Sequence, residues 1–183
     1  MNHLLDTKTD RLYIRPYRTD DFDKSFSLMQ DKDLYRFLHF DVMNYVEYQG
    51  LFNWLIQSYE SKGMDFKYSF AIILNETNQL IGWVGVGNLD FLQDEKEIYY
   101  LVGQDHWGKG FAYEAAQEVV NYSFNTLGLS RVVAKVAPEN LASKRIIEKL
   151  GFKFEYELNN LPEEHAECNG ELLYSLDKQD FSS

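Results

Sequence analysis

Cysteine, proline and positive charge are scarce in this sequence. The chain of 183 residues has one cysteine, Cys168, and three prolines. A single cysteine excludes an internal disulfide and a zinc site built from several thiolates. Lysine and arginine number 18 against 29 acidic residues, so the formal net charge is −11. This balance argues against a nucleic-acid-binding protein that relies on phosphate contacts, and it suits positively charged partners or substrates.

Long apolar runs are also missing. No stretch approaches the roughly 18 consecutive apolar residues of a membrane-spanning helix, so we expect none. The first residues, Met1 to Asp6, show no basic region followed by an apolar run, which predicts no signal peptide. The four histidines show no metal-ligand spacing, and we expect no metal site. The sequence therefore predicts a cytoplasmic protein that binds neither membranes nor nucleic acid.

What is present is the pattern of one folded domain, residues 1–183, in which 45% of the residues are hydrophobic. Alternating and helical spacings predict a mixed α/β sheet covered by helices. Gly82, Gly85 and Gly87 fall inside a strand pattern, so we interpret them as bulge or close-packing glycines. The predicted strands are 11–16, 69–74, 80–87, 97–102, 131–136, 152–158 and 171–176. The predicted helices begin at Thr19 and Asn140, run through 34–38, from Val46 to near Gly63, and from Ala112 to Gly128.

A glycine-bearing loop, residues 107–112, lies between a predicted strand and the long helix that follows it. Its sequence is Trp-Gly-Lys-Gly-Phe-Ala. Glycines there let the backbone approach a ligand, and the amides of the loop and of the first helical turn form an anion site suited to a pyrophosphate. The alternative is a plain strand-to-helix turn. The segment is neither a Walker loop nor a Rossmann fingerprint.

A second segment, residues 140–152, reads as a helix capped by Asn140 and ended by Gly151. Together with the other motifs it makes an ordered set that resembles the GNAT superfamily of acyl-CoA N-acyltransferases, and most closely the Rim-type group that acetylates protein N-termini. Many family members carry glutamine or arginine where Trp107 stands, and tryptophan is usual in the Rim-type group. The resemblance spans about residues 8 to 176. Its motifs are Asp10–Pro16, Leu80–Gly82, Glu97–Val102, Trp107–Ala115, Asn140–Ser143 and Gly151–Phe152.

The resemblance implies a GNAT-like fold: a central, mostly antiparallel sheet with a splayed parallel strand pair, 97–102 and 131–136, and helices on both faces. It also implies acetyl-CoA as cosubstrate. Backbone groups of Leu101 and Val102 would contact the pantetheine and the thioester, where an N–H could stabilise the oxyanion of the tetrahedral intermediate. The side chain of Asn140 would contact the cofactor. The residues expected around the pyrophosphate are Trp107, Gly108, Lys109, Gly110, Phe111 and Ala112.

Two side chains are candidates for proton transfer. Glu97 shares a strand face with Tyr99 and Leu101 and is our candidate general base for the attacking amine. The alternative for Glu97 is an exposed carboxylate at a strand end. Ser143 resembles the serine that donates a proton to the leaving CoA thiolate in Rim-type enzymes, and the alternative is a local capping role. Tyr99 and Tyr100 are reserve proton donors.

The resemblance thus implies an N-acetyltransferase that transfers an acetyl group directly to a primary amine in a ternary complex. The expected acceptor is a protein N-terminal α-amine. Two alternatives stay open. One is a small-molecule amine such as a polyamine or an aminoglycoside, which the acidic balance also suits. The other is a non-catalytic acyl-CoA-binding module. The chain is expected to be a monomer or a homodimer.

Overall fold

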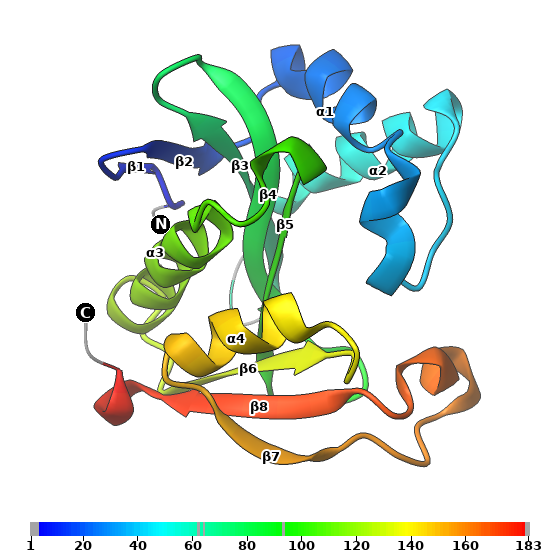
Figure 1. Cartoon of the computed structure of the whole chain (residues 1–183), viewed down its shortest axis with the longest axis vertical. Coiled ribbons are helices and arrows are strands. Elements are labelled where there is room, and N and C mark those ends of the chain that lie inside the picture. Colours follow the sequence, from blue (N-terminus) through cyan, green and yellow to red (C-terminus); the bar gives the residue numbers. More distant parts are fainter. Residues whose placement is uncertain (1–3, 62, 64, 93, 182–183) are drawn as a thin grey trace.

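Eight strands form one sheet in the computed structural model, which describes residues 4–61, 63, 65–92 and 94–181 (Figure 1). The strand order is β1-β2-β3-β4-β5-β6-β8-β7. The strands are β1 Thr7–Lys8, β2 Leu12–Pro16, β3 Lys67–Leu74, β4 Gln79–Asn88, β5 Lys96–Val102, β6 Arg131–Val136, β7 Lys153–Glu157 and β8 Leu172–Asp177. The α-helices are α1 Phe22–Leu28, α2 Tyr45–Ser58, α3 Phe111–Asn125 and α4 Leu141–Lys149.

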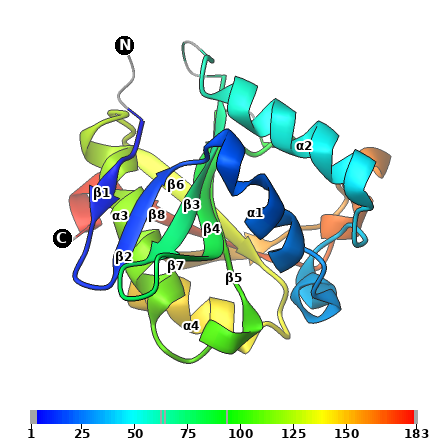
Figure 2. The ribbon, with the colours of Figure 1, turned by 90° about the horizontal axis from the view of Figure 1, so that it is seen from above.

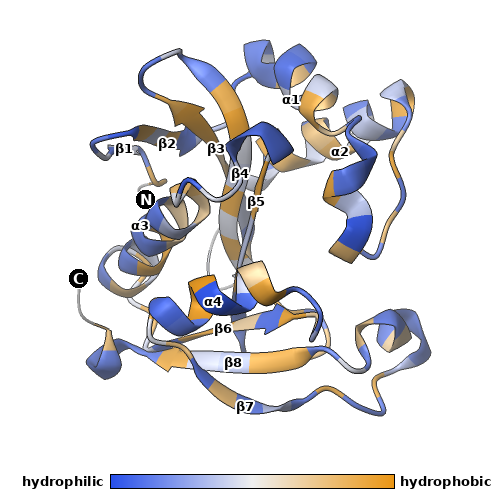
Figure 3. Cartoon of the chain, in the orientation of Figure 1, coloured by the Kyte–Doolittle hydropathy of each residue, from blue (hydrophilic) through white to orange (hydrophobic). Residues whose placement is uncertain are grey.

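Helices cover both faces of the sheet, as the sequence predicts (Figure 2). Strand β3 shows why: its buried residues alternate between two cores. Phe70 and Ile72 pack in the core on the side of α3 and α4. Ala71 and Ile73 pack in the core on the side of α1 and α2. Figure 3 shows the apolar residues gathered on the strands and on the helix sides that face them.

The pair of strands that matters for function is β5 and β6, which run parallel in an otherwise antiparallel sheet. Among the described residues they share one register pair, Glu97 with Val133. Beyond that pair the two strands take different directions (Figure 1). The predicted fold class, with its splayed parallel pair, is therefore confirmed.

Short helical turns account for most departures from the predicted elements. The helix expected from Thr19 begins as a 3-10 turn, Thr19–Asp21, before α1, and the stretch 34–38 lies in a 3-10 helix, Lys32–Phe37. The polar segment before β8 holds a further 3-10 helix, Glu163–Cys168. Helix α3 ends at Asn125, ahead of Gly128. These 3-10 helices have three to six residues, too few for a clear periodic signal. No helix in the described part of the chain combines the length and apolarity needed to cross a membrane.

Close packing at Gly85 on β4 helps position β5. A Cβ atom on Gly85 would lie 2.3 Å from the Tyr68 carbonyl oxygen and 2.4 Å from the ring of Tyr99. On the same strand, the pairing with β3 jumps from Gly82 to Leu80, which leaves Ile81 as a bulge. The interpretation of these strand glycines as bulge or close-packing positions is confirmed at Gly82 and Gly85.

We expect Gly85→Ala to destabilise the protein by about 1–3 kcal/mol, because the added methyl group would force the Tyr99 ring or the β3 backbone to move. Gly50→Ala is the control: Gly50 lies in α2 and a Cβ there meets nothing within 4 Å. Alanine should stabilise that helix by about 0.5–1 kcal/mol. Urea unfolding of the three proteins measures both effects, and equal midpoints for Gly85→Ala and the wild type would contradict the first.

Candidate active site

The glycine-bearing loop leads from β5 into α3. Gly108 and Gly110 have φ angles of 72° and 82°, a region that side chains disfavour, so glycine is needed at both positions. The first hydrogen bond between a helix amide and a carbonyl four residues earlier runs from Glu114 N–H to the Gly110 carbonyl. The amides of Phe111 and Ala112 precede it and stand at the positive end of the helix dipole. This geometry fits an anion such as a pyrophosphate.

Arg11, the residue before β2, contacts both the loop and the start of α3. Its guanidinium donates to the Lys109 carbonyl at 2.8 Å and pairs with Glu114, with Nη2 2.5 Å from Oε2. It also lies 4.7 Å from the centre of the Phe111 ring. The Lys109 ammonium donates to the Asp105 carbonyl at 2.8 Å. The loop conformation is therefore set by contacts within the protein.

Trp107 joins the loop to the end of β5. Its indole N–H donates to the Val102 carbonyl at 2.6 Å, while the residue stays 52% exposed. The neighbouring Leu101 carbonyl points toward β4, since a Cβ on Gly82 would meet its oxygen at 2.1 Å. Of the two residues predicted to offer backbone groups to an acyl carrier, Val102 is thus the one whose carbonyl faces the loop.

Glu97 lies at the point where β5 and β6 part. It is the β5 member of the shared register pair and is only 7% exposed, so the alternative of an exposed strand-end carboxylate is wrong. Burial raises the pKa of Glu97, and the ammonium of Lys135, 3.9 Å away, acts in the opposite direction. A carboxylate with a raised pKa is a better proton acceptor near neutral pH than an ordinary one. Tyr99, on the same face, donates to the Tyr68 carbonyl at 2.8 Å.

Lys135 belongs to a cluster that joins segments far apart in the sequence. Its Nζ lies 3.1 Å from Oε2 of Glu171, and Nε2 of His39 lies 3.1 Å from Oε1 of the same carboxylate. Burial lowers the pKa of Lys135, but Glu97 and Glu171 raise it further, to about 12. The ammonium therefore stays charged at neutral pH.

The buried thiol of Cys168 lies beside this cluster. The ligand-type atoms of His39, Cys168 and Glu171 lie within 4.8 Å of one another. Burial, reinforced by Glu171 and opposed by Lys135, raises the pKa of the Cys168 thiol to about 11. A protonated thiol is a poor metal ligand, and the Lys135 ammonium already neutralises Glu171. These residues fit an ion-pair cluster better than a metal site.

Ser143 and Asn140 lie at the start of α4. The Asn140 side-chain oxygen accepts from the Ser143 amide at 3.1 Å, so Asn140 is the cap, as predicted, and the alternative capping role of Ser143 is not needed. The Ser143 hydroxyl lies 2.9 Å from the Tyr100 hydroxyl. Burial raises the pKa of Tyr100 to about 12, with Ser143 acting against it, so Tyr100 keeps its proton. Tyr100, rather than Tyr99, is the tyrosine next to Ser143.

Strand β5 thus separates two kinds of chemistry. Glu97 and Leu101 face α1 and α2, while Tyr100 and Val102 face α3 and α4. One side offers a buried carboxylate and the other offers hydroxyl groups and the glycine-bearing loop. The arrangement can take a proton on one side of the strand pair and give one on the other.

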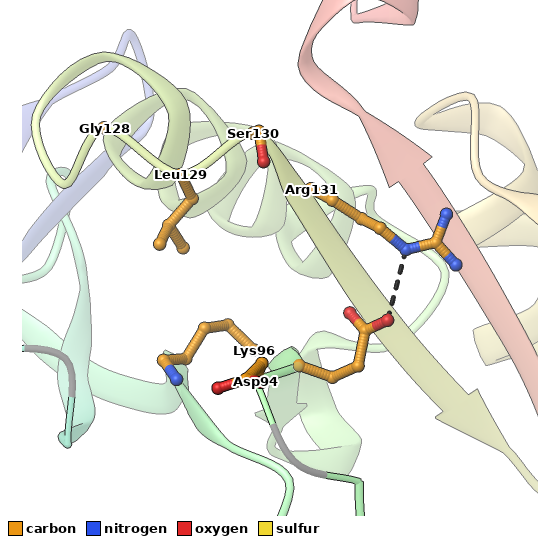
Figure 4. A pocket seen from close by; sticks show the side chains of 7 residues that line it. Asp94, Lys96, Gly128, Leu129, Ser130 and Arg131 are labelled. Carbon is orange, nitrogen blue, oxygen red and sulfur yellow. Dashed lines mark hydrogen bonds and ion pairs between the residues drawn. The ribbon is translucent and has the colours of Figure 1, made fainter.

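A separate hollow lies at the opposite end of the same strands (Figure 4). Residues 94–96 and 128–131 line it, next to the first residues of β5 and β6. Arg131 pairs there with Glu95, its Nε 3.3 Å from Oε1. The loop does not line this hollow, and neither does Glu97, although Glu97 directly follows Lys96.

Sequence reasoning missed Lys135, Glu171 and His39. A lysine inside the β-branched strand Arg-Val-Val-Ala-Lys-Val was an available signal, because a charge in a buried strand needs a partner. Nothing in the spacing points from that lysine to Glu171 or His39.

Comparisons with known proteins bear on this geometry. A family model described as an acetyltransferase (GNAT) domain matches residues 11–153. An uncharacterized N-acetyltransferase from Bacillus licheniformis, p20, is 30% identical over 174 residues, covering 95% of this chain and 97% of that protein.

Two crystal structures share the fold. A GNAT-family acetyltransferase from Bacillus anthracis has a TM-score of 0.79 at 24% identity, and the match covers 96% of this chain and 99% of that one. Spermidine N-acetyltransferase from Vibrio cholerae, in complex with CoA and spermine, has a TM-score of 0.75 at 18% identity, covering 94% and 98%.

Proposed function

Because this chain belongs to the GNAT family of N-acetyltransferases, we propose that it transfers the acetyl group of acetyl-CoA to a primary amine held beside Glu97. The observation that carries the proposal is the place of Glu97: a buried carboxylate at the point where β5 and β6 part. A buried base there suits an amine, which must lose a proton to form an amide.

The donor side of the strand pair fits the acyl carrier. Gly108, Gly110 and the amides of Phe111 and Ala112 would hold the pyrophosphate, with Trp107 and Lys109 beside it. Backbone groups of Leu101 and Val102 would line the pantetheine. Since the side-chain oxygen of Asn140 caps α4, its amide nitrogen is the group offered to the cofactor. The bound carrier supplies an activated acetyl thioester.

Proton transfers then follow from the two faces of β5. Glu97 accepts the proton that the amine loses as its nitrogen bonds to the acetyl carbon. Ser143 gives its hydroxyl proton to the sulfur as the carbon–sulfur bond breaks, and Tyr100, 2.9 Å away, orients that hydroxyl. Exchange with solvent returns Glu97 and Ser143 to their starting states. The oxyanion that develops on the substrate would accept a hydrogen bond from a backbone N–H near Val102.

The proposed acceptor is a protein N-terminal α-amine, on the likeness of the Trp107 loop to the Rim-type group. About one α-amine in ten is neutral at pH 7, against roughly one lysine ε-amine in two thousand, so the α-amine demands less of the base. A polyamine is the second candidate. The net charge of −11 favours it, and the related Vibrio cholerae structure holds CoA and spermine.

Calorimetric titration with acetyl-CoA tests the donor side. We expect the wild type to bind and Gly110→Trp to lose binding, because the side chain would occupy the loop next to the α3 amides. Gly128→Trp is the matched control: Gly128 follows the other end of α3 and has a similar φ angle of 72°. Loss of binding in both variants, or in neither, would contradict the assignment of the loop.

Kinetics of Glu97→Gln test the base. We expect kcat/KM to fall by about 10²–10⁴-fold, since an amide cannot accept the proton. In the wild type, kcat/KM should fall as the pH drops through the raised pKa of Glu97, and this limb should vanish in the variant. Glu95→Gln, which removes the carboxylate that pairs with Arg131 two residues earlier in the chain, should keep both rate and profile.

Release of free CoA thiol, measured across N-terminal peptides and polyamines, tests the acceptor. We expect turnover with peptides and little with spermidine. The reverse preference would select the polyamine candidate. Binding of acetyl-CoA with no transfer to any amine would support the non-catalytic alternative.

A further inference from the structure

We propose that Lys135 is a positioning residue of the reaction: held by Glu171, and through Glu171 by His39, its ammonium keeps the Glu97 carboxylate ionised and oriented where β5 and β6 part. This inference deepens the proposed function and rests on it. It concerns residues that the motifs of the sequence do not include.

The four side chains form a continuous line of contacts. Nζ of Lys135 lies 3.9 Å from Oε1 of Glu97 and 3.1 Å from Oε2 of Glu171, whose Oε1 is 3.1 Å from Nε2 of His39. The line leads from the buried Glu97 to the exposed His39. It joins β5, β6, the residue before β8 and the segment after the 3-10 helix Lys32–Phe37.

A buried carboxylate stays ionised only when a positive charge or strong donors compensate for lost hydration. The charged groups that act on Glu97 are Lys135 on β6, Lys67 on β3, Glu171 before β8 and Asp90 after β4. Within the described residues, Lys135 is the one cation within 4.0 Å of Glu97. It is therefore the cation best placed to offset the effect of burial on Glu97.

The unequal distances also matter. A lysine bound tightly to Glu97 would occupy the oxygen that must receive a proton and would make it a weak base. Glu171 draws the ammonium toward itself, because the shorter contact is to Glu171. The Lys135 ammonium thus stabilises the ionised form of Glu97 and still leaves its oxygens able to accept a proton. An ion pair that served stability alone would not need one lysine to be shared unequally between two carboxylates.

The test compares Lys135→Met, Lys135→Arg and Glu171→Gln in the full-length protein. Carbon-13 NMR of the side-chain carboxyl groups, assigned with Glu97→Gln, follows the titration of Glu97 without any substrate. The pH profile of kcat/KM is measured in parallel with acetyl-CoA and either the N-terminal peptide or spermidine. Lys153→Met is the matched control, because it removes an exposed ammonium that pairs with Asp180 at 2.7 Å.

We expect Lys135→Met to raise the titration midpoint of Glu97, and the acidic limb of kcat/KM, by about one to three pH units. Lys135→Arg should restore both. Glu171→Gln should move both downward, because it removes a negative charge near Glu97 and frees Lys135 to approach it. Lys153→Met should change neither. The pKa of the free amine substrate does not depend on residue 135. A shift of the acidic limb between variants therefore reports a group of the enzyme.

A folded Lys135→Met protein whose Glu97 titrates as in the wild type would overturn the inference. If that variant does not fold, an upward or absent shift in Glu171→Gln would overturn it instead. Glu97→Gln with full kcat/KM and an intact profile would overturn the proposed base, and the inference with it. Loss of the limb in Glu97→Gln together with an unshifted limb in Lys135→Met would overturn the inference alone.

Discussion

The structure depends on the parting of two parallel strands. A sheet normally satisfies each backbone group with a neighbouring strand, and β5 and β6 give up that pairing beyond Glu97 and Val133. Backbone groups that leave the ladder are free to make other hydrogen bonds. The Trp107 indole already uses one such group, the Val102 carbonyl, which shows that the freed edge of β5 offers hydrogen bonds. The loop into α3 follows β5 directly, and Tyr100 of β5 contacts Ser143 at the start of α4.

The charge of Glu97 is compensated by neighbouring charged side chains. Glu97 is buried because it sits where the strands are still in register, and burial makes its ionised form costly. Lys135 offsets that cost from the neighbouring strand, and Glu171 offsets the charge of Lys135 in turn. Among the acidic residues near the surface, Asp90 also acts on Glu97 and raises its pKa, but it lies outside this line of contacts. That line is a local network built from three segments of the fold.

Much of the fold could be predicted because hydrophobic periodicity indicates the strands and helices, and capping and turn residues indicate where they begin and end. Strand β6 matches its predicted bounds, and α4 begins after the predicted cap, Asn140. The glycines indicated the loop, and the resemblance to the GNAT superfamily indicated Glu97 and Ser143. The structure places Ser143 beside Tyr100, which was a reserve candidate for proton donor. The Lys135 cluster could not be predicted in this way. Its members come from distant segments, and His39 and Glu171 lie 132 residues apart in the sequence. Only the folded sheet brings them together.

The two faces of β5 impose a rule on how this protein can change. Tyr100 lies three positions after Glu97, and an odd offset puts the two side chains on opposite sides of the strand. Deleting or inserting one residue between them would turn one group to the wrong face and break the match of Tyr99 with Gly85. Length variation is therefore confined to connections such as the one between β7 and β8, which carries Cys168 and Glu171. Strand β5 itself can therefore vary by substitution but not by insertion or deletion.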